Sequence, residues 1–175
     1  RLPYATQARG ARRARIPVAC PMSLTEPQPN ADQLLACATG AADAFRAFDQ
    51  AQVDRVVRAV FEAAYEARTR LARLAVDETG MGVYEHKVLK NAWASLLVYQ
   101  DIRHRRTVGE ISHDPEAGLT EVAQPRGPVL GTVPLTNPTS TAIFKALICL
   151  KTRNPLIISP HRAARRCVRE TAQVL

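Results

Sequence analysis

The fold is decided by residues 128–161, which read PVLGTVPLTNPTSTAIFKALICLKTRNPLIISPH. Two short, nearly continuous apolar runs at 128–135 and 155–159 predict strands that are buried on both faces of a sheet. Between them, residues 139–150 show helical spacing, and another helical pattern starts at Arg162. This strand–helix–strand–helix order predicts an α/β fold with a parallel sheet and a right-handed crossover.

Three helices are expected before this unit. Asn30 is a candidate N-cap for a helix that extends to Phe48. A second helix, from Val53 to Leu74, has an apolar face at three-and-four spacing and ends near the glycines of 79–82. The third has one apolar stripe, formed by Val88, Leu89, Ala92, Trp93, Leu96 and Tyr99. Residues 119–123 alternate like a strand, and a turn follows at 124–127.

The composition is that of a globular domain, with 46% hydrophobic and 23% charged residues among 175. No apolar run approaches the ~20 residues of a membrane helix, so we expect no membrane span. The four cysteines are scattered and the four histidines follow no metal-ligand spacing, so no metal site is expected. Without a secretory signal, reduced thiols in a cytoplasmic protein are the expectation.

The formal net charge of +8 comes largely from one end of the chain. Residues 1–22 hold five arginines and no acid, whereas the remainder has 19 basic and 16 acidic residues, a net charge of +3. We expect residues 1–22 to be a basic leader that is disordered or not native, with translation starting at Met22; a targeting peptide is the alternative. Together with the basic cluster 151–169, the leader also motivates a second hypothesis, a nucleic-acid-binding module.

The expected functional site lies where the two parallel strands end. Ligands of open parallel sheets bind beyond the carboxyl ends of the strands, here residues 134–138 and 159–161. Pro138 suits the first turn of a helix, with Thr136 or Asn137 as its cap. Asn137 therefore has two interpretations: a plain N-cap, or an amide that donates to negative charge, as an oxyanion hole requires.

Several motifs in consistent order carry a family resemblance. They are VDETGMGVYE at 76–85 followed by Lys87 and Lys90-Asn91, VPLTNPTSTAIFK at 133–145, LKTRN at 150–154 and ISPH at 158–161. These segments resemble the CoA-acylating aldehyde dehydrogenases, most closely the aldehyde dehydrogenase half of bifunctional aldehyde–alcohol dehydrogenases. The resemblance implies that residues 23–175 are the N-terminal part of an NAD-binding domain: N-terminal helices, then the first part of a Rossmann-type sheet.

The resemblance also implies an activity, the NAD-dependent oxidation of a short aldehyde to acyl-CoA or its reverse, with CoA as co-substrate. Asn137 would stabilise the oxyanion. The nicotinamide would lie along Val133, Pro134, Leu135 and Thr136, and the adenosine ribose near Ser159, Pro160 and His161, with NADP as the alternative nucleotide. The partners would be small molecules rather than nucleic acid or a membrane, and the complete enzyme a homo-oligomer. Its nucleophilic cysteine would lie outside this chain, so we expect the chain alone to be inactive.

Overall fold

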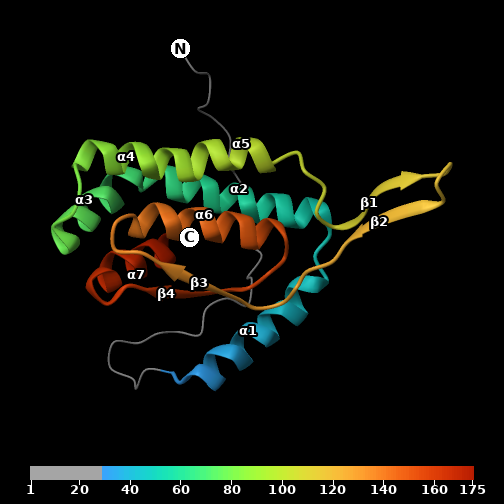
Figure 1. Ribbon diagram of the computed structural model, residues 1–175, viewed down its shortest axis with the longest axis horizontal. Helices are drawn as coiled ribbons and strands as arrows, with labels where there is room; N and C mark the ends of the chain where they lie inside the picture. Colours follow the sequence, from blue (N-terminus) through green and yellow to red (C-terminus); the bar gives the residue numbers. More distant parts are fainter. Residues whose placement is uncertain (1–28) are drawn as a thin grey trace, which may run out of the picture.

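The structure is a computed structural model and describes residues 29–175; the expected basic leader, 1–22, lies outside them. The helices are α1 (Ala31–Arg46), α2 (Gln50–Glu66), α3 (Arg68–Thr79), α4 (Tyr84–Ala92), the π-helical turn η1 (Trp93–Leu97), α5 (Val98–Ile102), α6 (Pro138–Lys151), the 3-10 turn η2 (Arg162–Ala164) and α7 (Arg165–Val174). The strands are β1 (Gly109–Asp114), β2 (Leu119–Ala123), β3 (Val129–Val133) and β4 (Leu156–Pro160). Helix α6 lies between the β3–β4 pair and the helices α2, α4 and α5, whereas α1 lies below that pair in this view and the β1–β2 hairpin projects away to the right (Figure 1).

The first two helices begin as their sequences direct. Asn30 Oδ1 accepts from the Gln33 backbone N–H at 2.9 Å, and the Gln33 side chain accepts from the Asn30 N–H in return. Asp49 and Gln52 form the same reciprocal capping box at the start of α2. Each box satisfies two backbone donors that a helix start otherwise leaves unpaired. The predicted N-cap Asn30 is confirmed.

The single helix predicted from Val53 to Leu74 is wrong, because the chain bends at Ala67 and forms α2 and α3. The Arg68 guanidinium donates to the Tyr65 carbonyl at 2.7 Å and lies over the Tyr65 ring. The Arg68 carbonyl in turn accepts from the Asn91 side chain at 2.9 Å. The apolar spacing continues through the bend, so the sequence pattern does not reveal it. The end of α3 is as predicted, with Gly80 in the left-handed conformation at φ 63°.

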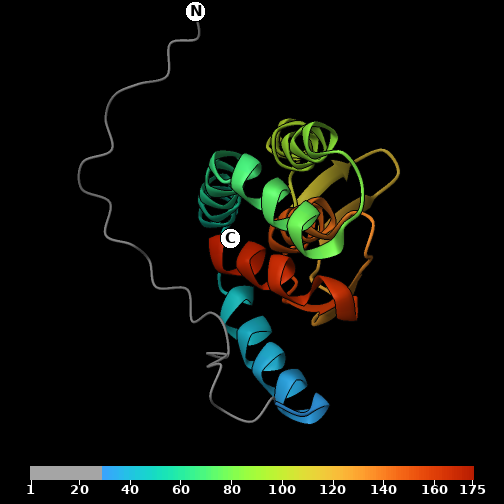
Figure 2. The same cartoon turned by 90° about the vertical axis from the view of Figure 1, so that its left-hand side faces the viewer.

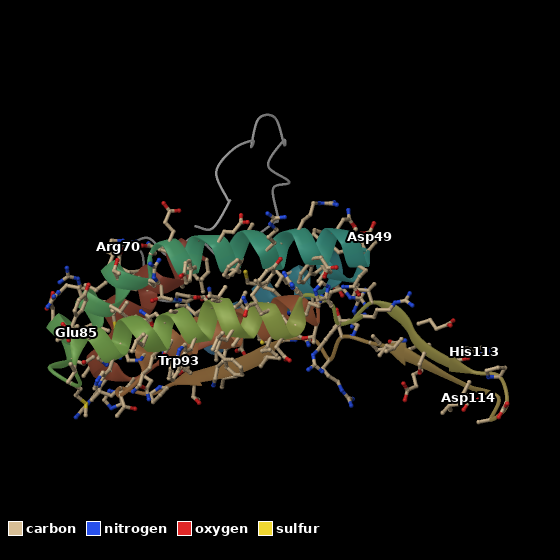
Figure 3. All side chains as sticks on the ribbon, turned by 90° about the horizontal axis from the view of Figure 1, so that it is seen from above. Asp49, Arg70, Glu85, Trp93, His113 and Asp114 are labelled. Atoms are coloured by element: carbon tan, nitrogen blue, oxygen red, sulfur yellow. The ribbon has the colours of Figure 1, made fainter. Side chains whose placement is uncertain are left out.

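The third helix is continuous through α4, η1 and α5, but its predicted buried stripe is partly wrong. Trp93 is 59% exposed and Leu89 51% exposed, and Figure 3 shows Trp93 on the side away from α2. The inward face is instead formed by Lys87, Asn91, Ala94 and Ser95. These residues keep ordinary three-and-four spacing, but three of them are polar and make buried or part-buried hydrogen bonds, so an apolar pattern alone misplaces the face. Tyr99 does pack, stacked on Phe61 at 4.3 Å.

The parallel pairing of β3 with β4 is confirmed, with Val129 opposite Leu156 and Val133 opposite Pro160. The prediction that both faces of β3 are buried is wrong, because Leu130 is 66% exposed. Within residues 29–175, α6 covers one face of the pair and no second layer covers the other (Figures 1 and 2). Strand β2 was predicted, whereas its antiparallel partner β1 was not; the strands carry exposed side chains, and β1 has no buried face to mark it.

Two buried clusters support the site. The larger joins α1, α2, α3, α6 and the α4–α5 helix and contains Phe45, Val53, Val57, Val60, Ala64, Leu71, Ala94, Ile102, Ile143 and Leu147. The smaller joins α3, β3, α6 and α7 and contains Ala75, Val133, Ala142, Ala164, Cys167 and Val168. Because α6 contributes to both clusters, its first residue is held firmly against the end of β3. No helix in the described part of the chain is long and apolar enough to cross a membrane.

Candidate active site at the start of helix α6

The carboxyl ends of β3 and β4 bring the two predicted cofactor segments together. Val133 pairs with Pro160, and the His161 N–H donates to the Val133 carbonyl at 2.9 Å. The Val133 side chain is buried in the smaller cluster, so it presents only its backbone. Leu135 and Pro160 are half-buried, and the exposed residues at this edge are Pro134, Thr136, Ser159 and His161. His161 Nδ1 also accepts from the Ala163 N–H at 3.2 Å, which assigns the ring a role in capping η2.

Asn137 begins α6, but its side chain does not cap the helix. It lies at φ −138° and ψ 57°, and no helix N–H donates to its Oδ1. That oxygen accepts instead from Lys90 Nζ at 2.9 Å, while Nδ2 lies 3.4 Å from Thr136 Oγ1. Asn137 is thus the N-cap residue by position, as one interpretation held, but its side chain makes no capping bond, and its amide nitrogen makes one long hydrogen bond only.

Helix α4 supplies polar contacts to this segment that the sequence reasoning did not foresee. Lys87, 5% exposed, donates from Nζ to the Thr136 carbonyl at 3.0 Å. Asn91, 1% exposed, accepts from Thr139 Oγ1 at 2.8 Å. Burial lowers the pKa of Lys87, and the nearby Lys90 charge lowers it further. The signal was present as Lys87, Lys90 and Asn91 at i, i+3 and i+4, because such residues share one helix face.

The described cysteines do not provide a nucleophile here. Burial raises the pKa of Cys149. Burial, followed by the hydrogen bond and charge of Glu78, raises the pKa of Cys167 to about 12. A thiol held neutral in this way is a poor nucleophile. Cys37 is exposed on α1, and its helix does not reach the start of α6. Cys149 is part of the buried core.

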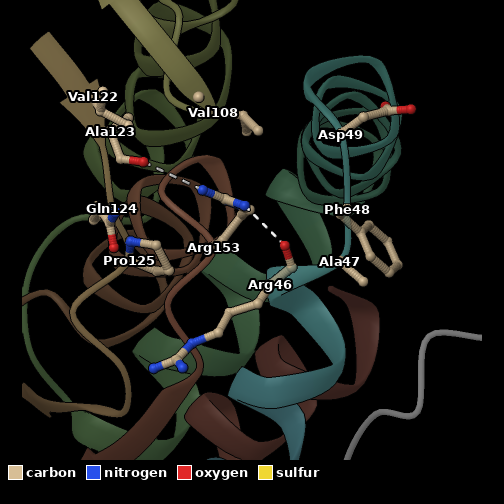
Figure 4. Close-up of a pocket in the computed structure, with 11 residues that line it drawn as sticks. Arg46, Ala47, Phe48, Asp49, Val108, Val122, Ala123, Gln124, Pro125 and Arg153 are labelled. Atoms are coloured by element: carbon tan, nitrogen blue, oxygen red, sulfur yellow. Dashed lines mark hydrogen bonds between the residues drawn. The ribbon is translucent and has the colours of Figure 1, made fainter. Parts of the chain in front are cut away.

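A cavity of about 510 Å³ lies elsewhere, between the α1–α2 corner and the base of the hairpin. Arg153 reaches across it, donating to the Arg46 carbonyl at 3.0 Å and to the Ala123 carbonyl at 3.5 Å (Figure 4). Its guanidinium ties α1 to β2, and this cavity contains none of the predicted site residues. Within residues 29–175, no three His, Cys, Asp or Glu side chains gather as metal ligands would.

Comparison with known proteins relates this site to one class of enzyme. No protein-family model matches the chain. The bifunctional aldehyde-alcohol dehydrogenase AdhE of Escherichia coli (strain K12) is 47% identical over 131 residues, which cover 75% of this chain and 15% of that protein. An acetylating aldehyde dehydrogenase structure from Geobacillus thermoglucosidasius superposes with a TM-score of 0.80 at 44% identity, covering 82% of this chain and 32% of that one.

Two more distant structures hold ligands. Propionaldehyde dehydrogenase from Rhodopseudomonas palustris, with bound propionyl-CoA, has a TM-score of 0.68 at 26% identity, and the match covers 82% of this chain and 31% of that one. An engineered glycolyl-CoA reductase with bound NADP+ has a TM-score of 0.65 at 27% identity, with 82% and 32% covered. The fold is thus that of the N-terminal part of the aldehyde dehydrogenase family. The chain is homologous to the acylating aldehyde dehydrogenases and spans less than a third of the length of these relatives.

Proposed function

We propose that this chain is part of an enzyme that oxidises a short aldehyde to acyl-CoA with NAD, or catalyses the reverse reaction. One observation carries the proposal: the Asn137 amide follows the carboxyl end of β3, its Oδ1 is held by Lys90 instead of a helix N–H, and its nitrogen makes one long hydrogen bond only. Homology to acylating enzymes supports the reaction class. The arrangement suits an acyl transfer in which negative charge develops on a carbonyl oxygen.

The exposed edge formed by the ends of β3 and β4 fits a dinucleotide. Ser159 offers a hydroxyl to a ribose, and His161, whose Nδ1 is occupied by the Ala163 N–H, offers Nε2. Pro134, Leu135 and Thr136 would lie along the nicotinamide, which supplies the hydride acceptor when bound. The segment Ser159-Pro160-His161 contains no acid to repel a 2′-phosphate, and one homologue binds NADP+, so NADP remains the alternative to NAD.

The role of Asn137 is to donate from Nδ2 to the aldehyde oxygen as a thiolate attacks the carbonyl carbon. The attacking cysteine and the acyl pocket come from sequence outside this chain, because Cys149 and Cys167 are buried with raised pKa values. Loss of hydride from the resulting tetrahedral adduct, which a bound nicotinamide would accept, gives a thioester on the cysteine. CoA then takes the acyl group from that thioester and the cysteine thiol is released. We therefore expect the 175-residue chain alone to form no acyl-CoA, and acyl-CoA formation by purified chain of this length would contradict that expectation.

A graft into a characterised relative tests the proposal. The homologous segment of the E. coli bifunctional enzyme is replaced by that of this chain, and CoA-dependent acetaldehyde oxidation is measured with NAD and with NADP. We expect aldehyde oxidation to persist, with NAD preferred. The alcohol dehydrogenase activity of the same molecule reports on its integrity. A graft that keeps alcohol oxidation but loses aldehyde oxidation would overturn the proposal.

The nucleic-acid hypothesis receives no support from the described residues. The α7 segment of the basic cluster is partly matched by acids, because Glu78 accepts from the Arg166 and Cys167 N–H groups and Glu170 pairs with Arg70 at 3.2 Å. Salt-dependent DNA affinity that survives deletion of residues 1–21 would revive it.

A further inference from the structure

Helix α4 contacts the segment 136–139 through three side chains to which the proposed reaction gives no role. Lys87 Nζ donates to the Thr136 carbonyl, Lys90 Nζ donates to Asn137 Oδ1, and Asn91 accepts from Thr139 Oγ1. Each contact reaches a different residue of this segment, which leads from the loop after β3 into the first turn of α6. The Lys87 and Asn91 contacts are buried and fix its backbone and first helical turn, whereas the Lys90 contact fixes a functional side chain.

We propose that Lys90 is a positioning residue for Asn137, and this inference rests on the function proposed above. An asparagine amide has an accepting end and a donating end, which exchange when the group rotates by half a turn. With the Lys90 ammonium 2.9 Å from Oδ1, that rotation would place the NH₂ group against the cation. Lys90 therefore holds Nδ2 as the end that faces the aldehyde oxygen.

The positive charge of Lys90 supports the same role for Asn137 as its position does. Hydrogen bonds from an ammonium are stronger than those between neutral groups, and they polarise the acceptor amide. Within residues 29–175, no carboxylate forms an ion pair with Lys87 or Lys90. The Lys90 charge therefore polarises the Asn137 amide without an ion pair to neutralise it, and Nδ2–H becomes a better donor to the developing oxyanion.

Kinetics in the grafted enzyme test the inference through a double-mutant cycle. We expect Lys90→Met to lower kcat about tenfold, a fraction of the loss caused by deleting an oxyanion donor, with KM for NAD unchanged. Lys90→Arg, which keeps a cationic donor, restores most of the rate. In an Asn137→Ala background, Lys90→Met should have no further effect, because the two residues act as one unit. Arg55→Met, which removes an exposed arginine from α2, is the matched control and leaves kcat unchanged.

The outcomes separate this inference from the function on which it rests. If Asn137→Ala is as active as the graft, the oxyanion role itself fails. If Asn137→Ala lowers kcat but Lys90→Met does not, only the positioning role fails. The same holds if Lys90→Met lowers kcat by the same factor whether or not Asn137 is present.

A spectroscopic measurement on the chain itself gives a second readout. We expect Lys90→Met to shift the Asn137 side-chain amide signals in ¹⁵N-correlated NMR spectra and Lys90→Arg to restore most of the shift, while Arg55→Met leaves them in place. If the chemical shifts of the Asn137 side-chain amide do not change in Lys90→Met, the proposal is wrong.

Discussion

The two ends of helix α6 are built on opposite principles. At its C-terminal end, Lys151, 2% exposed, donates to Asp54 Oδ1 at 2.6 Å, and the same oxygen accepts from Gln50 Nε2. Gln50 Oε1 accepts from the Thr107 N–H, and Thr107 Oγ1 donates to the Lys151 carbonyl, which closes the ring. At the N-terminal end, two lysines meet carbonyl and amide oxygens. At the C-terminal end of α6, which we call the closed end, the ion pair and the ring of hydrogen bonds stabilise the fold. At the N-terminal end, the open end, the lysine charges have no carboxylate partner among the described residues and are suited to chemistry.

This contrast predicts that substitutions at the two ends affect different properties. The largest effect is expected for Asn137→Ala in the grafted enzyme, where loss of one oxyanion donor lowers kcat by about 10²–10³. The stability of the chain should change little, because the side chain makes no capping bond. Steady-state kinetics and urea denaturation measure the two properties.

Asn30→Ala is the matched control, because the same substitution removes a working cap from α1. It should cost about 1 kcal/mol of stability and leave kcat of the graft unchanged. If Asn137→Ala destabilises the chain as much as Asn30→Ala does, the Asn137 side chain serves the helix, and the contrast between the two ends of α6 is lost.

The second prediction concerns the closed end. Lys151→Met keeps the aliphatic stem but removes the ammonium, so Asp54 loses its charged donor and keeps only Gln50 Nε2, and the Arg103 carbonyl loses its donor. Breaking a buried ion pair costs several kcal/mol, but the Asp54 side chain is 41% exposed and remains hydrated, so we expect about 2 kcal/mol. The midpoint of urea denaturation measures this loss. Lys90→Met, at the other end, should not move that midpoint.

A smaller effect is expected for Gln50→Ala, which opens the ring without touching its ion pair. The Thr107 and Val108 N–H groups lose their acceptor and Asp54 loses a donor. Unpaired, partly buried backbone donors cost about 1 kcal/mol here. If the stability losses of Gln50→Ala and Lys151→Met add up in the double mutant, the ring of hydrogen bonds is not a cooperative unit.

The sequence predicts the strands and helices that carry the site better than the side-chain contacts that orient it. The βαβα unit follows from local signals: apolar runs, Pro138 after Asn137, and a return to helical spacing. The contacts that orient the site join residues far apart in sequence, such as Lys90 and Asn137, separated by 47 positions, and no local pattern encodes them. The misplaced Trp93 has a related origin, because the buried face of its helix holds Lys87 and Asn91, whose partners are also distant in sequence.

The smallest expected effect is a pH dependence from the open end. Burial and the Lys90 charge lower the pKa of Lys87 in the folded chain below that in the unfolded chain. Between these two pKa values the unfolded chain binds more protons, so stability rises with pH on the alkaline side of neutrality as Lys87 loses its charge. As the pH is raised from neutral to alkaline, we expect the urea midpoint of the wild type to rise relative to that of Lys87→Met. Cysteine titrations cancel in this difference because both proteins contain them. If the urea midpoints of the two proteins change with pH in the same way, Lys87 keeps its ordinary pKa, and its burial beside Lys90 costs the fold no stability.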